Sequence, residues 1–172
     1  MKRSLEIICA SPAETARVGA TLADWLRDGD VVLLHGDLGA GKTTLAKGIA
    51  AALQVDGVVS SPSFALVNEY ETGLAAAATR LLHLDLFRLA GDDDLASIGF
   101  DELAAATDAV ALIEWPERAN AMLPDRYVLI ELSIVGSHQR QLRITPVPAD
   151  DGWATRIEDL FARFDPSSTQ RP

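Results

Sequence analysis

The sequence predicts a single-domain α/β fold in which a mostly parallel central sheet with antiparallel additions carries helices on both faces. Fully apolar runs such as residues 110–113 are typical of buried parallel strands. Helical patterns alternate with the strands, and some strands follow each other directly, which implies antiparallel pairs. The chain has 172 residues, 48% hydrophobic and 23% charged, as one domain with its own core requires. We expect that domain to span residues 1–164 and residues 165–172 to form a disordered tail.

A short strand over residues 5–8 and a helix from residue 12 to about residue 27 open the chain. Ser11 is a suitable N-cap, followed by proline at the first helical position and glutamate two positions later. Apolar residues recur along the helix at intervals of three and four, so Trp25 is expected in the core.

The next strand runs from residue 31 directly into G-x-x-x-x-G-K-T and a helix from Lys42 to about Leu53. This is a phosphate-binding P-loop, in which glycines let backbone N–H groups point inward and the helix N-terminus attracts an anion. Lys42 would reach the β- and γ-phosphates, and the Thr43 hydroxyl would bind Mg²⁺. The predicted nucleotide-binding loop comprises Gly36, Asp37, Leu38, Gly39, Ala40, Gly41, Lys42, Thr43 and Thr44.

The rest of the chain predicts five strands and two helices. The strands are expected over 65–70 and 81–87, which form a hairpin, and over 110–113, 127–134 and 141–145. The helices are expected after Asp92-Asp93-Asp94, covering 95–98, and from about 153 to 164.

Two acids end apolar strands, where a P-loop fold places its working groups. Glu114 follows residues 110–113 and could join Thr43 in holding Mg²⁺. Asp85 could orient the attacking water or assist the metal. The alternative for each is an acid that only ends a strand.

Other polar residues carry weaker signals. The hydroxyls of Ser61-Pro62-Ser63-Phe64 could sense a γ-phosphate, or this segment could be a plain connector. His35, His83 and His138 lack metal-ligand spacing and are expected to be packed or surface histidines. The sequence lacks an Asn-Lys-x-Asp segment that would read guanine, which favours ATP over GTP.

The composition restricts the partners. With 25 acidic against 15 basic residues, the formal net charge is -10, so a broad basic surface for nucleic acid is not expected. A role with RNA would then run through a partner protein. The sequence has one cysteine, no apolar run of about 18 residues and no signal-peptide pattern, which predicts a cytoplasmic protein.

Four motifs, in this order and spacing, resemble the TsaE family, formerly YjeE. They are the P-loop, Ser61-Pro62-Ser63-Phe64, His83-Leu84-Asp85-Leu86-Phe87-Arg88 and Glu114-Trp115-Pro116, and the resemblance runs from about Ser11 to Arg143. It implies a small cytoplasmic P-loop ATPase needed for N6-threonylcarbamoyladenosine (t6A) at position 37 of tRNAs that read codons beginning with A. It also implies that TsaB and TsaD are the partners that carry out the transfer.

The resemblance also assigns site residues. It implies that Thr43 and Glu114 bind magnesium, that Asp85 is the functionally important aspartate and that Trp115 lies beside the nucleotide. The helix that opens with Ser11 to Thr15 would border the adenine. A late Gly-Arg pair of the family corresponds to Gln139-Arg140, where the glycine is missing, and the usual Ser-Pro-Thr is Ser61-Pro62-Ser63.

We expect a Mg²⁺-dependent ATPase that drives or resets a tRNA-modifying complex. One alternative is a small-molecule kinase of similar size, although the sequence lacks the Arg-rich lid segment that clamps a transferring phosphoryl group. The other is a non-catalytic adaptor in which ATP only stabilises a binding surface.

Overall fold

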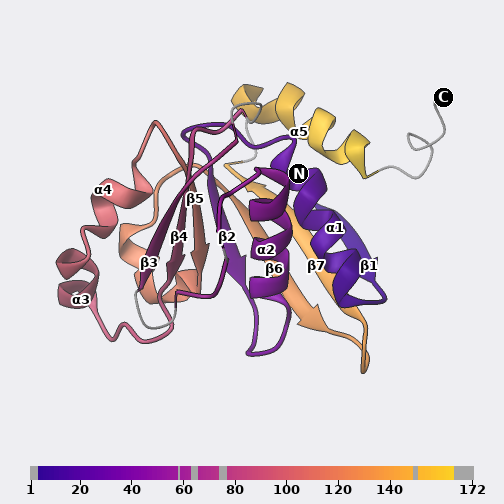
Figure 1. Cartoon of the computed structure of the whole chain (residues 1–172), viewed down its shortest axis with the longest axis horizontal. Helices are drawn as coiled ribbons and strands as arrows, with labels where there is room; N and C mark the ends of the chain where they lie inside the picture. The colour runs from indigo at the N-terminus through magenta and orange to yellow at the C-terminus, as the bar shows by residue number, and fades with distance from the viewer. Residues whose placement is uncertain (1–3, 58, 63–65, 74–76, 149–150, 165–172) are drawn as a thin grey trace.

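A seven-stranded sheet forms the centre of the molecule (Figure 1). The structure, a computed structural model, describes residues 4–57, 59–62, 66–73, 77–148 and 151–164. The strands are β1 (Leu5–Cys9), β2 (Val31–His35), β3 (Val67–Glu71), β4 (Arg80–Asp85), β5 (Val110–Glu114), β6 (Tyr127–Ile134) and β7 (Arg140–Val147). The helices are α1 (Pro12–Ala23), α2 (Lys42–Ala52), α3 (Asp92–Ser97), α4 (Phe100–Ala104), α5 (Asp151–Arg163) and the 3-10 helix η1 (Pro116–Met122).

The strand order is β1-β7-β6-β2-β5-β4-β3, which confirms the predicted α/β fold with a parallel centre. Strands β6, β2, β5 and β4 are parallel neighbours, whereas β1, β7 and β3 pair antiparallel at the two edges. The predicted hairpin β3–β4 is present. The strands of β6–β7 are also antiparallel, because a short connection cannot make the crossover that parallel strands need.

Helices cover both faces of the sheet, as the sequence predicts. Because side chains alternate along a strand, Val32 and Leu34 of β2 join the core under α1, α2 and α5, while Val31 and Leu33 join a second core with α3 and α4. Figure 1 shows α1 and α2 lying in front of the sheet, with α5 along its upper end. A parallel strand buried on both faces therefore carries the phosphate loop.

Helices α1 and α2 approach each other closely at two glycines. A Cβ atom at Gly48 would overlap the Ala16 carbonyl, and one at Gly19 would overlap the Leu45 carbonyl oxygen. Side chains at either position would push the helices apart. This contact holds the N-terminal turn of α1 beside the start of α2, where the phosphate loop lies.

Several element ends differ from the predicted ones. Strand β4 ends at Asp85 rather than at Phe87, because the Asp85 Oδ1 accepts a hydrogen bond of 3.0 Å from the Phe87 N–H and turns the chain. Its partner β3 is Val67–Glu71, and residue 65, where the predicted strand begins, lies outside the described residues. Helix α3 ends at Ser97, before the predicted residue 98.

Helix α1 ends at Ala23, earlier than the predicted residue 27, and the segment after it contacts the C-terminal helix. Trp25 is buried, as predicted, and its Nε1–H donates to the Arg156 carbonyl at 2.7 Å. The Arg156 guanidinium in turn donates to both carboxylate oxygens of Asp30, at 2.8 and 2.7 Å. These contacts fasten α5 to the start of β2.

The predicted tail, residues 165–172, lies outside the described residues, and the domain boundary at residue 164 stays a prediction. Within the described part of the chain, none of the helices has the length and apolar character needed to cross a membrane.

Candidate functional site

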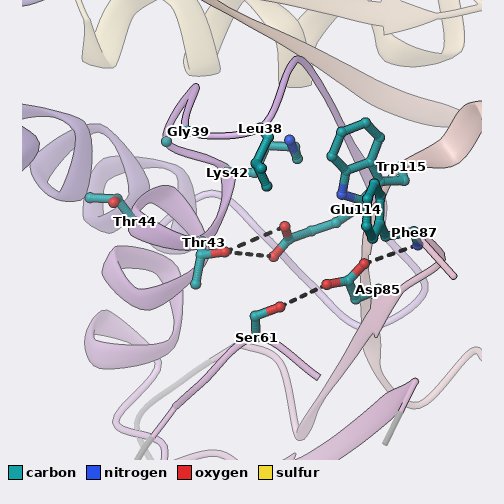
Figure 2. A pocket seen from close by; sticks show the side chains of 11 residues that line it. Leu38, Gly39, Lys42, Thr43, Thr44, Ser61, Asp85, Phe87, Glu114 and Trp115 are labelled. Atoms are coloured by element: carbon teal, nitrogen blue, oxygen red, sulfur yellow. Dashed lines mark hydrogen bonds between the residues drawn. The ribbon is translucent and has the colours of Figure 1, made fainter. Parts of the chain in front are cut away.

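The candidate site is a cleft of about 240 Å³ at the carboxyl ends of β2, β4 and β5 (Figure 2). These strands are parallel neighbours, so their ends meet at one edge of the sheet, where α/β proteins bind ligands. The lining residues are Leu38, Gly39, Gly41, Lys42, Thr43, Thr44, Ser61, Asp85, Phe87, Glu114 and Trp115. Most of the predicted site residues are therefore in one place.

The loop between β2 and α2 has the backbone of a phosphate cradle. Gly39 and Gly41 have φ angles of 79° and 106°, which a side chain would strain, and Gly41 is the N-cap of α2. At Gly36 a Cβ atom would overlap the Leu132 carbonyl oxygen. The loop thus places backbone amides and the positive end of an 11-residue helix at the cleft, which suits an anion.

Lys42 is the first residue of α2, directly after this loop, and is only 5% exposed. Its Nζ donates to the carbonyl oxygens of Gly36 and Asp37 at 2.5 and 2.9 Å, and it lies 4.0 Å from the centre of the Trp115 ring. Burial lowers the pKa of Lys42 from its ordinary value, and the nearby Glu114 carboxylate partly opposes this effect. A phosphate group would offer the ammonium stronger acceptors than carbonyl oxygens do.

Thr43 and Glu114 form a pair of oxygen donors in the cleft. The Thr43 Oγ1 lies 3.4 and 3.5 Å from the two carboxylate oxygens of Glu114, a side chain from the end of β5 that is 2% exposed. A hydroxyl and a carboxylate suit Mg²⁺, which binds hard oxygen ligands and usually completes its shell with water and substrate phosphates. The described residues contain no cluster of three or more His, Cys, Asp or Glu that could hold a metal ion.

Asp85 ends β4 directly beside Glu114, since the two residues are in register across the parallel strands. Figure 2 shows Thr43, Glu114 and Asp85 pointing into the same cleft. Asp85 is 3% exposed, and its Oδ2 accepts a hydrogen bond of 2.7 Å from Ser61. Ser61 thus links the loop after α2 to this acid, while Ser63 lies outside the described residues.

The sequence analysis missed the contact of His83. This histidine is fully buried, as a packed histidine would be, yet its Nε2 lies 2.8 Å from the Glu114 Oε1. A signal was present in the sequence, because residues two apart on a strand share a face and His83 precedes Asp85 by two. His35, by contrast, is a surface residue, and its Nε2 lies 3.9 Å from the Glu117 Oε2.

Trp115 has a left-handed backbone with φ 60° and ψ 50°, which is uncommon for a bulky residue. Its backbone N–H donates to the Leu34 carbonyl at 3.2 Å, and the centre of its ring lies 4.8 Å from the centre of the Phe87 ring. The surrounding contacts hold this strained position and keep the indole at the cleft, next to Lys42.

A second cavity of about 100 Å³ lies on the other side of the phosphate loop. Thr15 and Arg140 both line it, and Arg140 donates to the Gly39 carbonyl at 3.3 and 3.2 Å. The structure thus brings together Thr15, predicted to border the adenine, and Arg140, predicted to lie near the nucleotide. Ser11 is not among the lining residues, because its hydroxyl caps α1 by accepting the Glu14 N–H at 3.2 Å. His138, an exposed residue as expected of a surface histidine, also lines this cavity.

Comparison with known proteins identifies one family. The family model described as "Threonylcarbamoyl adenosine biosynthesis protein TsaE" matches residues 9–142. The TsaE protein of Bacillus subtilis is 34% identical over 137 residues, covering 80% of this chain and 82% of the relative. That of Nostoc sp. is 38% identical over 160 residues, 91% of each chain.

A solved structure has a similar fold. The crystal structure of Bacillus subtilis YdiB superposes with a TM-score of 0.78 and 29% sequence identity, covering 96% of this chain and 99% of that one. The matched residues 9–142 include the phosphate loop, both strand-end acids and Trp115. By its match to the family model and to these relatives, this chain belongs to the TsaE family.

Proposed function

We propose that this protein is a Mg²⁺-dependent ATPase that hydrolyses ATP to ADP and phosphate in t6A formation on tRNA. The observation that carries the proposal is the meeting of a phosphate loop with Thr43, Glu114 and Asp85 in one cleft. An anion cradle, a cation, oxygen donors for a metal and a second acid, all of which phosphoryl transfer uses, lie there together.

The loop amides and Lys42 bind the phosphates. Lys42 gives up its bonds to the Gly36 and Asp37 carbonyls and donates to the β- and γ-phosphate oxygens instead. Because Lys42 is buried, its charge acts with little screening by water on the charge that develops during transfer.

Thr43 and Glu114 hold the magnesium ion, which neutralises phosphate charge when bound. Asp85, whose oxygens accept from Ser61 and the Phe87 N–H, is held firmly enough to orient a water molecule. The water oxygen bonds to the γ-phosphorus, the bond to the β–γ bridging oxygen breaks, and ADP leaves with the electron pair. The proton that the water loses passes through the Asp85 carboxylate to solvent.

The place in t6A formation follows from the family. Relatives that match at 34% to 38% identity carry the name tRNA threonylcarbamoyladenosine biosynthesis protein TsaE. The net charge of -10 suits a cytoplasmic accessory ATPase better than a direct tRNA binder. The partners that the resemblance implies are TsaB and TsaD, and we propose that tRNA is reached through them.

Product analysis tests the reaction itself. With ATP and Mg²⁺, the ATPase proposal expects free phosphate and ADP in equal amounts. A phosphorylated small molecule would instead indicate a kinase. Glu114→Ala should raise the Mg²⁺ concentration needed for hydrolysis, since it removes one of the two protein oxygen donors.

Reconstitution tests the biological role. Threonylcarbamoyl transfer from threonylcarbamoyl-AMP to tRNA is followed over many turnovers with TsaB and TsaD, with and without this protein. We expect a higher yield with the protein and little support from Asp85→Asn, which binds ATP but hydrolyses it slowly. Full support from Asp85→Asn would favour a non-catalytic adaptor, and equal yields without the protein would refute the role.

A further inference from the structure

The imidazole of His83 lies fully buried under the two strand-end acids. Its Nε2 is 2.8 Å from the Glu114 Oε1, and a carboxylate can only accept a hydrogen bond. The Nε2 therefore carries the hydrogen and donates it to Glu114. This bond joins the β4 strand to the acid proposed to bind the metal.

The sheet geometry dictates this contact. His83 is in register with Leu112, and Asp85 with Glu114, so His83 lies diagonally across from Glu114. All four side chains share one face because they alternate with residues of the other face. That face is the one covered by α2, whose first turn carries Thr43.

Packing alone does not account for a histidine at this position. The neighbouring side chains Leu81 and Leu112 belong to the apolar core. The Nδ1 of His83 is buried, and none of the described residues offers it a hydrogen-bond partner. Because an unpaired buried polar atom is costly, an apolar side chain would serve packing better. What the imidazole supplies, and leucine would not, is the bond to Glu114.

We propose that His83 is a positioning residue for the metal site, and that its N–H keeps the Glu114 carboxylate facing Thr43. The geometry fits this role, because both carboxylate oxygens lie at nearly equal distances from the Thr43 Oγ1, 3.4 and 3.5 Å. A glutamate has three rotatable bonds, and a fixed donor removes the orientations that face away. The inference rests on the proposed function, since it presupposes a metal ion at Thr43 and Glu114.

The experiment measures metal binding directly. Mn²⁺, as a paramagnetic substitute for Mg²⁺, is titrated against the full chain in the presence of ADP and followed by electron paramagnetic resonance. His83→Gln keeps an N–H near the Nε2 position, whereas in His83→Asn the shorter side chain cannot reach Glu114. The two variants bury the same amide group, so they differ chiefly in reach. Leu81→Val alters packing on the same strand face without touching Glu114 and serves as the control.

We expect His83→Asn to weaken Mn²⁺ binding about 10-fold, as loss of a partner behind a metal ligand does. His83→Gln should stay within about threefold of wild type, and ADP affinity without metal should be unchanged in both. Equal Mn²⁺ affinity in the Asn and Gln variants, or equal weakening by Leu81→Val, would overturn the proposal. If wild-type protein with ADP binds no Mn²⁺ at all, the proposed metal site itself fails, which is a different result.

Discussion

Replacing Asp85 by asparagine separates hydrolysis from nucleotide binding. The Asp85 carboxylate is 3% exposed and accepts hydrogen bonds from the Ser61 hydroxyl at 2.7 Å and from the Phe87 N–H at 3.0 Å. An asparagine can keep its carbonyl toward the Phe87 N–H and turn its amide toward the Ser61 oxygen, which can accept. The fold should therefore survive, with the free energy of unfolding changed by less than about 1 kcal/mol.

Hydrolysis should fall far more than stability. A positioned acid that orients or accepts from the attacking water contributes about 10²- to 10⁴-fold. Because asparagine keeps the hydrogen-bonding shape and loses only the charge, we expect the low end, about 100-fold, which corresponds to about 2.7 kcal/mol in the activation free energy. The affinity for ADP should stay within about threefold, since Asp85 does not belong to the phosphate loop.

The assay is single-turnover release of phosphate from ATP, with nucleotide affinity measured separately. Asp108→Asn is the matched control, because it makes the same chemical change at an acid outside the cleft. Asp108 lies just before β5, its side chain is 69% exposed, and it forms an ion pair with Arg80. That control should hydrolyse ATP at the wild-type rate. A wild-type rate in Asp85→Asn would mean that this acid only ends its strand, and the reasoning would be refuted.

Three further predictions follow from single contacts. Lys42→Ala should abolish hydrolysis and weaken ATP binding, because water cannot replace a buried charge at the phosphates; unchanged turnover would contradict the phosphate site. Trp115 fluorescence should change on adding ADP or ATP, because the phosphates draw the Lys42 ammonium away from the Trp115 ring, whose centre is now 4.0 Å from it. Trp115→Phe should remove this signal. A response carried by Trp25 would refute the placement of Trp115 beside the nucleotide. Arg156→Ala should lower the free energy of unfolding by about 2 kcal/mol, because it leaves the buried Asp30 carboxylate without the guanidinium that pairs with it. Urea titrations measure this change, and an unchanged midpoint would show that the ion pair does not stabilise the fold.

The local sequence was sufficient for the fold class and for the position of the glycine-rich loop between β2 and α2. The loop depends on glycines at fixed offsets between an apolar strand and a helix, and all of these are neighbours in the chain. The parallel centre of the sheet could be predicted because continuous apolar runs are typical of strands that are buried on both faces. The acids Asp85 and Glu114 were found by the same logic, since the ends of parallel strands meet at one edge.

Element ends were predicted less well, because side chains decide them through single bonds. Strand β4 stops at Asp85 since that carboxylate captures the Phe87 N–H, a contact that periodicity does not reveal. Helix α1 stops at Ala23, before the contact of Trp25 with α5. Hydrophobic patterns indicate which face of an element is buried, but not the residue at which it ends.

Only the tertiary structure decided which distant residues meet. The pairing of β4 with β5 sets His83 diagonally against Glu114, 31 positions away, and a shift of one residue would turn every side chain to the other face. The pairing of β1 with β7 sets Arg140 opposite Cys9, and the close approach of α1 to α2 sets Thr15 beside the glycine-rich loop, so that both residues line one cavity. Composition and periodicity describe each segment by itself, whereas register and helix crossing arise when separate segments pack into one core.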